Sequence, residues 1–193
     1  MLNNTNLNYG SVSIFFHWLS ALTVFGLFAL GFYMVDLTYY HPWYKTAPEL
    51  HKSIGITFFL LMIFRLLWRS TQITPSHLAS HTSLEQKAGK ITHTLLLLLI
   101  FMVMITGYLI STADGRGIEV FELIMIPALG SMIENQEDIA GLIHQWLAYL
   151  LIALATLHAL AALKHHFIDK DNTLNRIIGK RQKLESINEK TVN

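Results

Sequence analysis

The sequence predicts an all-α membrane protein, a bundle of four transmembrane helices. Of its 193 residues, 52% are hydrophobic and only 14% are charged, a composition too apolar for an ordinary soluble domain. Three runs, residues 12–35, 91–113 and 139–163, contain no Asp, Glu, Lys or Arg. Each run can cross about 30 Å of hydrocarbon as a helix that rises about 1.5 Å per residue. We therefore expect a single membrane domain over residues 1–193.

The four expected spans follow one another along the chain at residues 12–35, 50–69, 91–113 and 139–166. The second is the least apolar, because Lys52 and Arg65 lie near its ends. Long basic side chains in such positions can extend to the interface, so this run still predicts a span.

Two further segments are not expected to cross the membrane. The apolar run at residues 123–133 is too short and contains Pro127 and Gly130, so we expect it at the interface or packed over the bundle. Residues 171–193 form the expected cytoplasmic tail. An even number of spans places both termini on one side of the membrane.

Charge is distributed unevenly between the two ends of the predicted bundle. The loops after the first and third spans, with the adjoining helix ends, contain only three of the fourteen Lys and Arg residues, Lys45, Lys52 and Arg116. They also contain eight of the thirteen Asp and Glu residues, so this end has a net charge of −5 and the other end +6. Because excess Lys and Arg mark the cytoplasmic side, we expect cytoplasmic termini and an acidic outer surface.

Histidines inside the apolar runs are the candidate functional residues. The sequence has no cysteine, which excludes thiolate metal sites and covalent haem attachment through a C-x-x-C-H motif. An ionisable side chain within a span indicates a functional site, because its polar atoms need partners where water is absent. His144 and His158 lie fourteen residues apart, close to four turns, and so share one helix face about 21 Å apart. His51 is expected at the depth of His144, and His17 at the depth of His158.

A small residue follows each of these four histidines one turn later, where a flat macrocycle could lie against the helix. These residues are Ala21, Gly55, Ala148 and Ala162. We therefore expect two non-covalent haems b, one ligated by His17 and His158 and the other by His51 and His144. Two alternatives are histidines that only bond neighbouring helices, and zinc, for which two ligands per layer would be too few.

Other residues are expected around the two haems. Larger residues follow His93 and His165 one turn later, so these two histidines are not expected to be haem ligands. Both approach the cytoplasmic interface near the inner haem, where we expect them to border a quinone site, with ubiquinone as the substrate. Arg65 at the inner end, and Lys52 and Arg116 at the outer end, are candidate partners of the haem propionates. The remaining histidines are expected at the surface; they are His41, His77, His81 and His166.

Several of these segments resemble the bacterial cytochrome b561 family, which is related to the cytochrome b subunits of formate dehydrogenases and nickel–iron hydrogenases. The matching pieces are FFHWLS, ELHKSIG, KITHTLL and GLIHQWLAYLLIALATLHALAALKHHFIDKDNTLNRI. The resemblance covers about residues 9–178. It implies four helices in the bacterial inner membrane and two haems b, with the same two histidine pairs. One relative in this family oxidises periplasmic superoxide and passes the electron to ubiquinone.

The expected function is transfer of single electrons across the membrane between the quinone pool and a periplasmic redox partner. Two axial ligands leave an iron no open position, which favours electron transfer over oxygen binding. The acidic outer surface favours a cationic redox protein over the superoxide anion. The alternatives are a superoxide:ubiquinone oxidoreductase and a non-catalytic, haem-holding membrane anchor. No nucleic-acid partner is expected.

Overall fold

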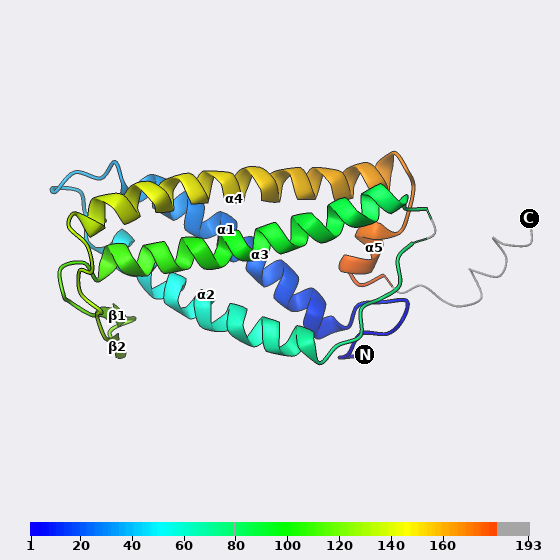
Figure 1. Cartoon of the computed structure of the whole chain (residues 1–193), viewed down its shortest axis with the longest axis horizontal. Coiled ribbons are helices and arrows are strands. Elements are labelled where there is room, and N and C mark those ends of the chain that lie inside the picture. The colour runs from blue at the N-terminus through cyan, green and yellow to red at the C-terminus, as the bar shows by residue number, and fades with distance from the viewer. Residues whose placement is uncertain (79, 181–193) are drawn as a thin grey trace, which may run out of the picture.

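Four long helices dominate the computed structural model, which describes residues 1–78 and 80–180 (Figure 1). In chain order the elements are α1 (Ser11–Met34), α2 (Thr46–Ser70), α3 (Ser83–Ser111), β1 (Ile118–Val120), β2 (Ile124–Ile126), α4 (Gln136–Phe167) and α5 (Thr173–Ile177). Helices α1 to α4 are all long and apolar enough to cross a membrane. The mostly helical architecture with four candidate membrane spans, predicted from the sequence, is therefore confirmed.

Helices α2, α3 and α4 are longer than the spans predicted for them, whereas α1 has the predicted length. Helix α3 begins at Ser83, eight residues before the expected start at residue 91. Its first turn is stabilised by a capping box, in which the Glu85 backbone N–H donates to Thr82 Oγ1 and the Thr82 N–H donates to the Glu85 carboxylate. Polar residues therefore extend the helix past the apolar segment, because a cap satisfies its free N–H groups.

The core of the bundle lies midway along the helices. Helix α3 packs along α4, and α1 packs along α2 (Figure 1). One buried apolar cluster joins three of these helices and consists of Phe58, Met62, Leu99, Ile100 and Leu151. Many large apolar side chains point outward instead; Leu22, for example, is 70% exposed. Such outward-facing apolar side chains are expected of helices surrounded by lipid.

One end of the bundle contains both the N-terminal segment and α5 (Figure 1). The Trp18 indole N–H donates to the Ile177 carbonyl at 2.9 Å, which joins α1 to α5. Arg176, only 9% exposed, donates from Nη1 to the Ser76 carbonyl at 2.7 Å. These bonds fasten the first part of the expected tail to the bundle, while residues 181–193 lie outside the described residues.

The opposite end is covered by an antiparallel hairpin of β1 and β2, in which Ile118 pairs with Ile126. The hairpin rests on the start of α2, where the Phe121 N–H donates to Ser53 Oγ at 3.0 Å. This placement agrees with the expectation that the run from residue 123 packs over the bundle. The strands were not predicted, because the turn uses Phe121 and Glu122 at positive φ rather than the usual glycine or asparagine.

Candidate functional site

His51 on α2 and His144 on α4 face each other at the hairpin end of the bundle. Their ring centroids are 6.3 Å apart and their planes are inclined by 70°. His144 Nδ1 lies 2.9 Å from the Val103 carbonyl and 3.2 Å from Thr106 Oγ1, both on α3. A carbonyl can only accept, so Nδ1 carries the proton and Nε2 keeps its lone pair. This is the tautomer that a metal ligand requires.

Two glycines lie behind this pair of rings, which we call the outer pair because the hairpin end is the predicted outer end of the bundle. A Cβ added to Gly31 on α1 would lie 3.2 Å from His51 Cε1, and one added to Gly107 on α3 would lie 3.1 Å from His144 Cε1. On α2 itself, a Cβ at Gly55 would meet nothing within 4 Å among the described residues. The missing side chains of Gly31 and Gly107 therefore leave room for the rings of the outer pair against α1 and α3, and the surface of α2 at Gly55 is open.

Gly31 and Gly107 were not among the predicted site residues, because the prediction rested only on the small residue that follows each histidine in its own helix. The spacing of these glycines from other histidines in the sequence could have indicated them. Gly31 follows His17 by fourteen residues, and Gly107 follows His93 by fourteen residues. This spacing equals the His144–His158 separation, so it places each glycine on the face of its helix that also carries an inner histidine.

The inner pair consists of His17 on α1 and His158 on α4, with ring centroids 6.5 Å apart. A metal–imidazole bond is about 2.0 Å long and the ring centre lies about 1.1 Å behind the nitrogen, so rings on opposite sides of one iron are roughly 6 Å apart. Both pairs have this separation. The ring of His93 on α3 is only 4.9 Å from that of His158, which is too close for an iron between them.

The apolar core separates the two pairs along the bundle. Leu151 lies seven residues from both His144 and His158, and it packs in the cluster that contains Met62 and Leu99. On the outer side of this layer, His51 Nδ1 is buried and has no hydrogen-bond partner among the described residues. The four histidines are thus arranged as two separate pairs of nitrogen donors, and both pairs fit bis-imidazole ligation of haem iron.

The predicted propionate partners have different surroundings. Arg65 on α2 is half-buried and close enough to His17 and His93 to interact electrostatically with both. Arg116 is exposed, and its Nε donates to Asp114 Oδ2 at 2.6 Å. The hydrogen bonds from Arg116 hold the pKa of Asp114 below its ordinary value, and Lys52 adds a smaller effect in the same direction. Arg65 is therefore near a histidine pair, whereas Arg116 is engaged with Asp114.

The two candidate quinone-site histidines do not lie together. His93 is near the inner pair, but His165 Nδ1 lies 2.8 Å from Asp169 Oδ2, and the His165 ring is 4.7 Å from that of His81. His81 was expected at the surface. Its side chain is instead only 17% exposed, because it packs on Asp171, with Nε2 at 2.9 Å from Oδ2.

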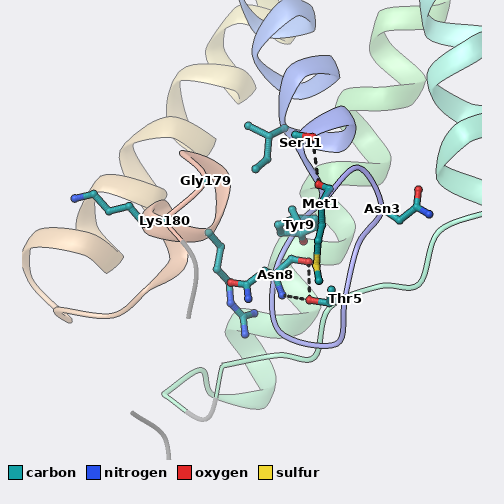
Figure 2. A pocket seen from close by; sticks show the side chains of 10 residues that line it. Met1, Asn3, Thr5, Asn8, Tyr9, Ser11, Gly179 and Lys180 are labelled. Atoms are coloured by element: carbon teal, nitrogen blue, oxygen red, sulfur yellow. Dashed lines mark hydrogen bonds between the residues drawn. The ribbon is translucent and has the colours of Figure 1, made fainter. Parts of the chain in front are cut away.

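A small cavity of about 110 Å³ lies between the N-terminal segment and α5 (Figure 2). Its lining includes Met1, Tyr9 and Arg176 but none of the histidines. It is smaller than the roughly 300 Å³ at which ligand pockets begin. This cavity is therefore separate from the candidate site.

Histidine pairs inside a bundle of membrane-length helices define a membrane cytochrome of the b type, which holds haem without covalent bonds. The model of the prokaryotic cytochrome b561 family matches residues 8–180. The chain therefore belongs to this family of electron-transfer membrane cytochromes, and membership implies that it binds haem b. Four apolar helices also fit the multi-pass inner-membrane location expected of this bacterial family.

Three relatives are similar over nearly their whole length. Cytochrome b561 homolog 2 of Escherichia coli K12 is 49% identical over 92% of this chain and 94% of that protein. Cytochrome b561 homolog 1 of the same organism is 27% identical over 90% and 98%. A probable superoxide oxidase, CybB of Yersinia pestis, is 30% identical over 90% and 97%. The probable superoxide oxidase is thus a more distant relative than cytochrome b561 homolog 2, at 30% against 49% identity.

Proposed function

We propose that this chain holds two haems b and moves single electrons across the membrane between the quinone pool and a periplasmic redox partner. The proposal depends on one observation above all, the two histidine pairs with ring centroids 6.5 and 6.3 Å apart on either side of the apolar core. His17 and His158 would hold the inner haem, and His51 and His144 the outer haem.

Haem bound by two histidines supplies one-electron transfer without an open coordination position. The chain's own residues then set where each histidine points. The Val103 carbonyl fixes the tautomer of His144, and Gly31 and Gly107 allow the outer rings to approach the neighbouring helices. Arg65 is the propionate partner that we propose at the inner end, because a half-buried guanidinium there pairs well with a carboxylate.

We assign the quinone site to the surroundings of His93. Its side chain is exposed, so that a membrane-dissolved quinone could reach it, and its ring is 4.9 Å from that of His158. A shallow hollow of about 220 Å³ next to it on α3 is lined by Lys90, Ile91, Thr94 and Leu95. His93 would exchange protons with the quinone as it is reduced or oxidised.

At the outer end the charge pattern favours a cationic redox protein, with both termini on the cytoplasmic side. The loops that form this end carry a net charge of −5, which attracts a cationic partner and repels an anion. Superoxide oxidation is the second candidate, favoured by the relative named as a probable superoxide oxidase and by the half-buried Lys52 next to His51.

Haem counting on the purified protein tests the central proposal. The wild-type chain is expected to hold two haems, His144→Ala one, and His77→Ala, which changes an exposed histidine outside the spans, two. One haem in the wild-type chain, or an unchanged count in His144→Ala, would contradict the assignment.

Reduction kinetics separate the functions. Quinol is expected to reduce the haems rapidly in the wild-type protein and slowly in His93→Gln, with the haem content unchanged. A chain that retains haem but is not reduced by quinol would be an anchor. Reduction by superoxide near the diffusion limit would favour the superoxide oxidase instead.

A further inference from the structure

Three chain segments bring nitrogen and oxygen donors together at the end of the bundle that carries α5. His81 comes from the loop between α2 and α3, His165 from the last turn of α4, and Asp171 from the turn before α5. One donor atom from each of these three residues lies within 4.8 Å of the other two. None of the three is a haem ligand in the proposed function, so the cluster needs its own explanation.

The cluster is largely shielded from solvent. The side chain of Asp171 is 5% exposed, that of His165 15% and that of His81 17%. Asp171 Oδ2 is 2.9 Å from His81 Nε2 and 3.5 Å from His165 Nδ1, and its other oxygen accepts from the Thr173 N–H at 2.8 Å. A carboxylate that is buried and fixed in this way needs cationic compensation.

His165 shows that hydrogen bonding alone does not account for the cluster. Its Nδ1 lies 2.8 Å from Asp169 Oδ2 and 3.5 Å from Asp171 Oδ2. Neither contact has hydrogen-bond geometry, and the atom is buried without a hydrogen-bond partner among the described residues. A nitrogen that approaches two carboxylate oxygens without bonding either is arranged like a ligand that points at a shared ion.

We propose that His81, His165 and Asp171 bind a divalent cation of the zinc class. Ligands about 2.0 Å from a tetrahedral ion are roughly 3.3 Å from one another, close to the two Asp171 contacts at 2.9 and 3.5 Å. His81 Nε2, His165 Nδ1 and Asp171 Oδ2 supply three donors. The fourth position of a tetrahedral ion is left to water, because Asp169 Oδ2 pairs with Lys164 at 2.7 Å and approaches only His165 of the three donors, at 2.8 Å. Imidazole and carboxylate donors in this ratio suit zinc better than magnesium or calcium.

Zinc titration of the haem-loaded, full-length protein tests the proposal after a chelator has removed adventitious metal. Calorimetry and elemental analysis are expected to show one zinc per chain beyond the haem iron. His81→Ala and His165→Ala are each expected to weaken binding by at least about tenfold. The matched control is His77→Ala, an exposed histidine in the same loop as His81, which should bind zinc as the wild type does.

The haem absorption spectrum separates loss of the site from loss of the fold. Both test histidines lie outside the proposed haem pairs, so the variants should keep the wild-type spectrum. Absence of zinc binding by the wild-type protein, or equal binding by His81→Ala and wild type, would overturn the proposal. Neither result depends on quinone or superoxide reactivity, so the zinc site can fail while the proposed electron transfer stands.

Discussion

Replacement of Gly107 by valine should selectively weaken the outer haem site. The alanine-sized part of the new side chain alone would lie 3.1 Å from His144 Cε1 and 3.4 Å from Nδ1, and carbon atoms ordinarily pack at about 3.5–4.0 Å. The imidazole would have to move by a few tenths of an ångström, and the two further methyl groups of valine increase the displacement. Movement is restricted, because Nδ1 donates to the Val103 carbonyl at 2.9 Å.

The size of this effect follows from the cost of overpacking. Extra carbon atoms in a packed site cost about 1–3 kcal/mol. At about 1.4 kcal/mol per factor of ten, this corresponds to roughly 5- to 150-fold weaker retention of the outer haem. The inner pair lies beyond the apolar core, so its haem should be retained as in the wild type.

Haem transfer to an excess of apomyoglobin measures this difference. Two phases are expected for Gly107→Val, one faster than any wild-type phase. Gly26→Val is the matched control, because Gly26 is exposed on α1 and a Cβ there meets nothing within 4 Å. If Gly107→Val released haem no faster than Gly26→Val, the recess behind His144 would have no part in holding haem.

The other predictions concern the second glycine, the core and the hairpin end. Gly31→Val should act on His51 as Gly107→Val acts on His144, with faster release of one haem in the same transfer assay. Met62→Ala should lower stability by about 2–5 kcal/mol, because Met62 is 1% exposed in the central cluster; an unchanged melting temperature would contradict this. Arg116 holds the pKa of Asp114 below its ordinary value, so the charged form stabilises the fold above about pH 3.9 and this contribution disappears as the pH falls through the lowered pKa. Asp114→Asn should therefore melt slightly below wild type at neutral pH, and the gap should close in acid; a gap that widens in acid would refute the sign.

Much of the site could be predicted from the sequence, because the relevant rules are local. The rise and turn of a helix depend on no other part of the chain, so fourteen residues always separate two positions on one face by about 21 Å. That regularity led to the pairing of His17 with His158 and of His51 with His144. The structure brings the members of each pair close together, with ring centroids 6.5 and 6.3 Å apart. Hydropathy located the spans for the same reason, since each run can be judged by itself.

Only the tertiary structure decided which atoms surround these histidines. The Val103 carbonyl and Gly107 contact His144 because α3 packs against α4 at a particular rotation, and rotation depends on the packing of both helices. His165 lies with His81 and Asp171, rather than with His93, because two loops return to the end of α4. The helix faces were thus determined by the sequence alone. The partners of each face depended on long-range packing and loop paths, which helical periodicity does not encode.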